Sequence, residues 1–218
     1  MLRERLEQVE QRIEAAVRRA GRKRCDITLV AVTKKFSGEV MHEAYQLGLR
    51  VFGENYVQEF EDKHPALTDM RDAEFHLIGH LQSNKTRVAL DLFQTIETVD
   101  SGKLARRLDQ GGRKLEVMIE VKLSHEESKA GAEPESLGSL IDEIRACPNL
   151  QLTGLMTMPP WNDDPEVTRP YFRRLAELAR EHGLAKLSMG MSHDLEAAIE
   201  EGSTHVRIGT ALFGPRVK

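Results

Sequence analysis

A lysine follows the first apolar run of the chain at a position that favours amine chemistry. Residues 27–33 form a short β-branched run that predicts a strand, and Lys34 comes directly after it. Because side chains alternate along a strand, Lys34 shares one face with Val30 and Val32. If that face is the inner one, partial burial and the neighbouring charge of Lys35 both favour the neutral amine, the form that makes a Schiff base. The alternative is that both lysines are solvated loop residues.

Two loops in the last part of the chain have the composition of a phosphate site. One follows the predicted strand 186–190 and the other follows the predicted strand 205–209. Glycines let the backbone approach a ligand closely, and backbone N–H groups at a helix start bind anions. We expect Ser192 to be the N-cap of a helix over 192–201, while Asp194 in its first turn repels a dianion unless it turns away. The glycine and hydroxyl residues of the two loops are Gly190, Ser192, Gly209, Thr210 and Gly214. Strand ends and helix caps without a ligand are the alternative.

Polar residues at other strand ends can complete such a site. Arg207 lies on the last predicted strand, on the same face as Gly209, and is expected to reach inward. A buried guanidinium needs an acceptor, which is either a ligand or a strand-end carboxylate such as Glu54 or Glu120. The residues alone leave both possibilities open. Asn55, directly after the second strand, offers both donor and acceptor groups.

Two histidines and two further lysines lie near the same strand ends. His76 and His80 are not at a metal-ligand spacing on a helix, so we interpret them as polar residues of the strand end. Lys129 lies in the segment 124–131 after the fifth strand. We hypothesise that Lys35 or Lys129 is a second, transient ligand site, on the basis of their positions only.

Eight short apolar runs alternate with helical segments along the chain. The predicted strands are 27–33, 51–54, 75–79, 94–99, 116–123, 152–158, 186–190 and 205–209. An opening helix over 2–20 comes first, and the other predicted helices are 38–48, 56–63, 83–91, 101–110, 134–146, 166–182 and 192–201. Strands that alternate with helices pair in parallel through right-handed crossovers, and eight such units can close into a barrel. Function is then expected on the loops that follow the strands.

These elements predict an α/β fold, a single-domain (β/α)₈ TIM barrel over 1–218 with an extra N-terminal helix. An open doubly wound sheet is the alternative, but it usually has a glycine-rich turn after its first strand. That turn reads TKKFSGE here and contains no GxGxxG motif. We find no linker or low-complexity tract, and the one longer irregular stretch is PPWNDDPE (159–166) after the sixth strand.

The composition is that of an ordinary globular protein with one sizeable core. The 31 basic and 35 acidic residues give a net charge of −4, which offers no electrostatic footprint for nucleic acid. The basic stretch 18–24 is interpreted as a solvated helix end. Cys25 and Cys147, far apart in the sequence, are typical of reduced cytosolic thiols. No signal peptide or membrane span is recognisable, so we expect a cytoplasmic protein and favour a monomer.

Segments spread over nearly the whole chain carry a family resemblance. In chain order they read LVAVTK, VFGENYVQE, FHLIGHLQSNK, ESKAG, LTGLMTM and LSMGMSHDLEAAIEEGSTHVRIGTALFG. Together they resemble the pyridoxal phosphate homeostasis protein family, whose fold is similar to the barrel domain of alanine racemase, that of fold-type III enzymes. The family often has a proline shortly after its lysine, whereas this chain reads KKFSGE, so the shape of that loop is expected to differ.

The resemblance implies that the chain binds pyridoxal 5′-phosphate as a Schiff base on Lys34. The other implied contacts are the phosphate with Ser192, Gly209 and Thr210, the pyridine nitrogen with Arg207, the ring with Asn55, and less specific contacts with His80 and Met189. An arginine beside the pyridine nitrogen disfavours a proton there, which makes the ring a poor electron sink.

Alanine racemases with such an arginine rely on a tyrosine base from a partner subunit and on a second β-domain. None of Tyr45, Tyr56 and Tyr171 is assignable to that role, and the chain continues for only eight residues after Thr210. We therefore expect a binding protein of intracellular pyridoxal phosphate homeostasis rather than an enzyme, with pyridoxal-phosphate-dependent apoenzymes as candidate partners. A weak amino-acid racemase, a Schiff-base aldolase for a phosphorylated substrate, and a regulatory module that docks through its charged first helix are the alternatives.

Overall fold

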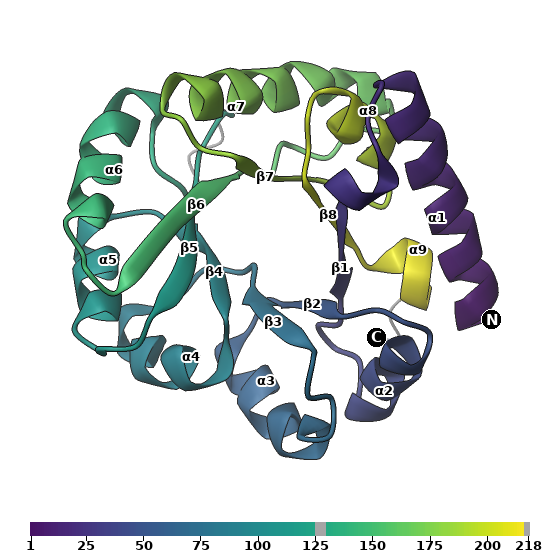
Figure 1. The fold of residues 1–218 in the computed structure, drawn as a ribbon, viewed down its shortest axis with the longest axis horizontal. Coiled ribbons are helices and arrows are strands. Elements are labelled where there is room, and N and C mark those ends of the chain that lie inside the picture. The colour runs from purple at the N-terminus through teal and green to yellow at the C-terminus, as the bar shows by residue number, and fades with distance from the viewer. Residues whose placement is uncertain (125–129, 216–218) are drawn as a thin grey trace.

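Eight parallel strands close into a barrel in the order in which they occur along the chain (Figure 1). The computed structural model describes residues 1–124 and 130–215. The barrel closes where the first strand pairs with the last, with Thr28 opposite His205. The strands are β1 Thr28–Val32, β2 Val51–Glu54, β3 Glu74–Leu77, β4 Thr95–Val99, β5 Leu115–Glu120, β6 Leu150–Met156, β7 Lys186–Met191 and β8 His205–Ile208. The predicted (β/α)₈ barrel is confirmed.

Helices surround the barrel on its outside (Figure 1). They are α1 Leu2–Arg19, α2 Gly38–Gln46, α3 Val57–Lys63, α4 Thr86–Leu92, α5 Gly102–Asp109, α6 Leu137–Arg145, α7 Arg169–Glu181, α8 Leu195–Glu200 and α9 Thr210–Phe213. The sequence did not predict α9, because four residues are too few for a helical period to be visible.

The start of α8 differs from the sequence prediction. Asp194 is its N-cap, and the Oδ1 atom of Asp194 accepts a hydrogen bond of 2.7 Å from the backbone N–H of Met191. The hydroxyl oxygen of Ser192 instead accepts a hydrogen bond of 3.2 Å from the N–H of Ala211. The prediction that Ser192 is the N-cap is therefore wrong, because this hydroxyl connects two loops.

Each strand separates two packed layers. On β1, Leu29 and Ala31 belong to the apolar core between strands and helices. Val32 lines the mouth of the barrel, and Val30 shares its face by strand alternation. The inner face of β1 is thus the one that carries the residues before Lys34, as the sequence predicted.

Helix α1 packs against the last elements of the chain, α8 and α9. Its apolar stripe, which includes Val9, Ile13 and Val17, is buried. On α8, Glu196 accepts hydrogen bonds from Arg12 at 2.6 and 2.7 Å. These contacts fix α1 across the strand pair at which the barrel closes.

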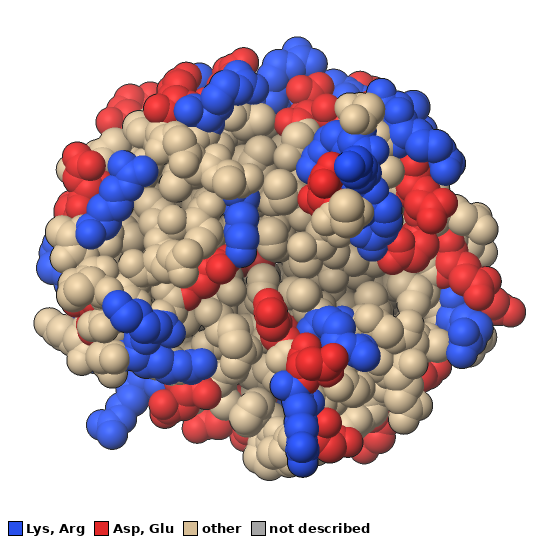
Figure 2. Space-filling view, in the orientation of Figure 1, with Lys and Arg blue, Asp and Glu red and all other residues tan. Residues whose placement is uncertain are grey.

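The basic stretch at the end of α1 is used within the molecule. Arg19 pairs with Glu200 at 2.6 Å, and Arg22 donates to the carbonyl oxygens of Ile199 and Ser203. Figure 2 shows basic and acidic side chains interspersed around the rim of one face. The contacts give no support to α1 as a free docking surface. Among the helices of the described residues, none has both the length and the apolar composition needed to cross a bilayer.

Candidate functional site at the barrel mouth

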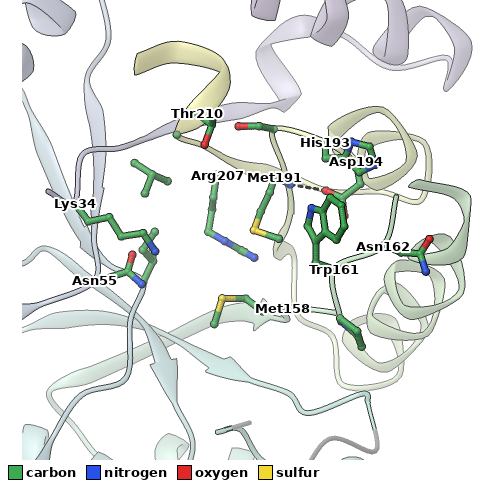
Figure 3. A pocket seen from close by; sticks show the side chains of 15 residues that line it. Lys34, Asn55, Met158, Trp161, Asn162, Met191, His193, Asp194, Arg207 and Thr210 are labelled. Atoms are coloured by element: carbon green, nitrogen blue, oxygen red, sulfur yellow. Dashed lines mark hydrogen bonds between the residues drawn. The ribbon is translucent and has the colours of Figure 1, made fainter. Parts of the chain in front are cut away.

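A cavity at the carboxyl ends of the strands brings most of the predicted site residues together (Figure 3). Its lining comprises Val32, Lys34, Asn55, Ile78, Met158, Pro160, Trp161, Asn162, Met191, Ser192, His193, Asp194, Arg207, Gly209 and Thr210. Six of the eight residues predicted from the sequence are among them. The cavity thus joins the first two strands to the last two, which neighbour each other around the closed barrel.

Lys34 projects into this cavity from a tight turn. The N–H of Phe36 donates to the carbonyl oxygen of Thr33 at 3.0 Å. Lys35 has a φ of 65°, which makes it the one non-glycine residue with positive φ in the described part of the chain. Its N–H donates to Glu59 Oε1 at 2.5 Å, on the helix side of the turn. The left-handed backbone at Lys35 therefore separates the two lysines, and Lys34 extends alongside Asn55 (Figure 3).

Lys63 stabilises this turn from the helix side. Its ammonium group lies 2.5 Å from Glu59 and 3.1 Å from Glu54, and it also donates to the Thr33 carbonyl. Glu54 is fully buried, and burial raises the pKa of its carboxyl group while the charge of Lys63 opposes that rise. Lys63 is therefore the cation that makes a buried carboxylate tolerable here.

Arg207 is almost completely buried below the cavity. Its guanidinium donates to the hydroxyl oxygen of Ser188 at 2.8 Å and to the carbonyl oxygen of Thr157 at 2.9 Å. Burial lowers the pKa of the guanidinium, and the charges of Glu97 and Glu120 oppose that shift. Glu54, one of the two acids considered as its partner, pairs with Lys63 instead.

The loops after β7 and β8 meet at the other side of the cavity. The hydrogen bond from the Ala211 N–H to the Ser192 hydroxyl joins them. Gly209 precedes α9 and packs against β1, where an added Cβ would lie 3.5 Å from Val32. The hydrogen bond between Asp194 and Met191 restrains the carboxylate that the sequence identified as a source of repulsion. The arrangement gives backbone N–H and hydroxyl groups at one end of the cavity.

Asn55 contributes an unsatisfied acceptor. Its side-chain oxygen is buried and has no hydrogen-bond partner among the described residues. A buried amide oxygen without a partner costs free energy unless a ligand or water donates to it. Lys34 and Asn55 lie side by side in the cavity (Figure 3), so a polar ligand there meets both.

Two predicted residues lie away from the cavity. Met189 is fully buried in the core between strands and helices. Gly190 has a φ of 90° and the pairing of β7 with β8 shifts register between Ser188 and Met191, so Met191 takes the position at the mouth. His80 lines an adjoining cavity, where it lies 3.7 Å from Asp100.

The adjoining cavity shares Met158, Trp161 and Met191 with the first. No tyrosine lines either cavity within residues 1–124 and 130–215. Lys129, the other candidate for a transient site, lies outside the described residues. Lys35 is exposed on the outer side of its turn.

Sequence reasoning missed the residues that cover the mouth. Trp161 comes from the irregular loop after β6, and its ring centroid lies 5.8 Å from that of His193. Met158 and Met191 face each other across the cavity (Figure 3). One feature of the sequence could have identified them: the single tryptophan of the chain lies in the loop that follows a predicted strand, and this loop contains three prolines.

The fold and site define a barrel of the alanine racemase type. The family model for the alanine racemase N-terminal domain matches residues 5–217. An alanine racemase from Clostridium difficile 630 superposes with a TM-score of 0.71 over 96% of this chain and 60% of its own. At 16% identity, this likeness shows the fold alone.

Two other relatives are much more similar. The pyridoxal phosphate homeostasis protein of Aquifex aeolicus is 46% identical over 98% of this chain and 97% of its own length. The structure of PipY from Synechococcus elongatus, with pyridoxal phosphate bound, has a TM-score of 0.85 at 36% identity, over 98% of this chain and all of that one. The chain therefore belongs to the pyridoxal phosphate homeostasis protein family.

Proposed function

We propose that this chain binds pyridoxal 5′-phosphate at the mouth of its barrel, as a Schiff base on Lys34, and takes part in intracellular pyridoxal phosphate homeostasis without catalytic turnover. The observation that carries the proposal is that one cavity contains the Lys34 amine, the Arg207 guanidinium and the joined loops of Ser192 and Gly209. The names of the similar proteins from Aquifex and Synechococcus support the same ligand.

The residues of the cavity fit this cofactor. It has an aldehyde, a phosphate and a heteroaromatic ring with polar substituents. The unpartnered oxygen of Asn55 accepts a donor, and the glycine and hydroxyl groups of the two loops suit a phosphate. We assign the phosphate to Ser192, Gly209 and Thr210. Met158 and Met191 supply apolar contact for a ring.

Each of the predicted site residues then has a defined role. Lys34 provides the amine, and its turn aims it at the cavity. Arg207 donates toward the ring nitrogen and so disfavours a proton there. Asn55 orients the ring from the side of Lys34. His80 acts from the adjoining cavity, and Met189 acts indirectly, because it anchors β7, the strand that also carries Ser188 and Gly190, in the core between strands and helices.

When bound, pyridoxal phosphate supplies an aldehyde that reacts with amines and a ring that withdraws electrons from carbon next to nitrogen. Turnover also needs an acid or base positioned at that carbon. The cavity lining described here offers no tyrosine for that task. A binding protein that releases its cofactor to apoenzymes agrees with this set of residues.

Absorption spectroscopy and chemical trapping test the proposal. The protein incubated with pyridoxal phosphate is expected to turn yellow, and borohydride followed by peptide mass mapping should place the label on Lys34. Lys34→Ala should lose the label. Lys35→Ala is the matched control, because Lys35 is adjacent but faces the opposite side of the turn, and it should keep the label. A colourless wild-type protein without a label would overturn the proposal.

The two enzymatic alternatives have their own signatures. A racemase would exceed the rate of free pyridoxal phosphate with an amino acid and lose that excess in Lys34→Ala. An aldolase would be trapped by borohydride on Lys34 with a sugar phosphate and no pyridoxal compound present. If neither the racemase nor the aldolase signature is observed, the result supports a binding function.

We also propose that the chain acts as one cofactor-binding domain, as a monomer, in the cytoplasm, with apoenzymes as partners. Light scattering after size-exclusion chromatography measures the oligomeric state. Transfer is measured by mixing the loaded protein with an apoenzyme of known cofactor requirement. If the apoenzyme is activated faster than the loaded protein releases free cofactor into solution, the result would support direct delivery.

A further inference from the structure

The interior of the barrel below the cavity contains a chain of buried polar side chains. Small barrels are usually filled by branched apolar residues at this level. Here Ser188 and Glu97 are fully buried and His76 is 2% exposed. Burying such groups costs free energy unless they are satisfied, so the arrangement requires a physical explanation.

The hydrogen bonds among these side chains converge on Glu97 from two sides. Arginine is a donor only, so Ser188 accepts from Arg207 at 2.8 Å. The single hydroxyl proton of Ser188 then goes to Glu97 Oε2, at 2.5 Å. The other oxygen, Glu97 Oε1, lies 2.7 Å from His76 Nδ1. Each member therefore fixes the orientation of the next, from the middle of the barrel to the floor of the cavity.

The charges agree with Glu97 as the common acceptor. Burial opposes ionisation of Glu97, but its hydrogen bond to His76 and the charges of His76 and Arg207 outweigh burial and lower its pKa to about 2. Burial also opposes protonation of His76, but hydrogen bonds to Glu74 and Glu97 outweigh it and raise the pKa of His76 to about 9. At neutral pH Glu97 is thus an anion between two cations, and His76 donates its Nδ1 proton to it.

We propose that Ser188, Glu97 and His76 are positioning residues that hold the Arg207 guanidinium with its remaining N–H groups toward the bound ligand. This inference rests on the proposed pyridoxal phosphate site. Arg207 also donates to the Thr157 carbonyl, so two of its nitrogens are fixed from below. A guanidinium fixed in this way presents a donor, and a ring nitrogen that carries a proton has no lone pair to accept it.

The test measures the ring nitrogen and the affinity separately. Pyridoxal phosphate labelled with ¹⁵N reports protonation of its ring nitrogen by chemical shift, and quenching of Trp161 fluorescence reports the dissociation constant. For the wild type we expect the shift of an unprotonated nitrogen. For Ser188→Ala we expect roughly tenfold weaker binding and a shift toward the protonated value at the same pH, since a hydrogen bond to a charged group is lost. Borohydride should still trap the cofactor on Lys34.

Ser203→Ala is the matched control. Ser203 is also fully buried and its hydroxyl donates to strand carbonyl oxygens, such as that of Met189 at 2.8 Å, but the hydroxyl has no hydrogen bond with Arg207. It should keep the wild-type nitrogen shift whatever its stability. If Ser188→Ala does not fold, Ser188→Cys provides the test, because the thiol has the same connectivity as the hydroxyl but makes weaker hydrogen bonds.

The outcomes separate this proposal from the function on which it rests. A wild-type protein without label on Lys34 refutes the proposed function itself. A labelled wild-type protein whose Ser188 variants retain its nitrogen shift and affinity refutes the positioning role alone, and leaves the buried chain as a support of the barrel.

Discussion

The Lys63 ammonium group lies 3.1 Å from the carbonyl oxygen of Thr33, the residue directly before Lys34. The same ammonium pairs with the buried carboxylate of Glu54. One cation therefore fixes the backbone from which the Lys34 amine projects and also compensates the charge of a carboxylate that burial destabilises. The position of Lys34 depends on an ion pair outside the barrel wall.

Lys63→Met is expected to lower the free energy of unfolding by about 3 kcal/mol, because it leaves the Glu54 carboxylate buried without its cation. Urea unfolding at pH 7 measures the loss. Borohydride trapping of pyridoxal phosphate on Lys34 should also become slower. The double variant Lys63→Met, Glu54→Gln removes the uncompensated charge and should recover part of the stability. If the double variant is no more stable than the single one, the ion pair is not the cause.

The stability of the protein is expected to fall between about pH 6.5 and 9 because of His76. Its pKa rises from 6.5 in the unfolded chain to about 9 in the barrel. Protonation therefore stabilises the folded state fully below pH 6.5, and this contribution is lost as the pH rises through 9. The loss is on the order of 1–3 kcal/mol. His76→Gln should flatten this limb of the profile, and parallel profiles for the two proteins would argue against it.

Two glycines near the carboxyl ends of β7 and β8 should respond differently to replacement by alanine. Gly209→Ala adds a Cβ at ordinary contact distance from Val32, with a backbone φ of −112°, so the stability should change by less than about 1 kcal/mol. The methyl group lines the cavity and should weaken pyridoxal phosphate binding by roughly tenfold. Gly190→Ala should instead be strongly destabilised, because its φ is 90° and its Cβ would lie 2.4 Å from that of Ala198. Thermal unfolding and cofactor titration measure the two effects.

Trp161, the single tryptophan of the chain, should report occupation of the cavity. Bound pyridoxal phosphate absorbs where tryptophan emits, so saturating cofactor should quench most of the Trp161 fluorescence with a stoichiometry of one. Trp161→Phe removes the signal but should leave trapping on Lys34 intact. Quenching that persists unsaturated at high cofactor concentration would indicate collision in solution rather than binding at the mouth.

The barrel was predictable from the sequence because each strand is a short apolar run between helical segments. Most boundaries differ from the prediction by a few residues, and the four residues of α9 escaped it. The start of α8 was misplaced because local rules favoured Ser192 as a cap. The hydroxyl of Ser192 is in fact used by Ala211, a contact between loops that no local pattern contains.

The positions of candidate residues at strand ends were predictable, as for Lys34 and Arg207, which both line the cavity. The sequence predicted Met189 at the site, whereas Met191 lines the cavity. This could not be predicted, since the register shift at Gly190 breaks strand alternation. Glu97 was overlooked although an acid in the middle of a buried strand is unusual. Its partners Ser188 and His76 lie on other strands, and only the closed barrel brings the three together.

The docking of α1 on α8 and α9 has a consequence for biosynthesis. The buried stripe and Arg12 of α1 are matched to α8 and α9, which are synthesised after α1 and after most of the barrel strands. Until residue 213 has been synthesised, that stripe has no native surface to cover it. The mouth of the barrel is therefore completed only when α1 meets α8 and α9, after the residues between them have been synthesised.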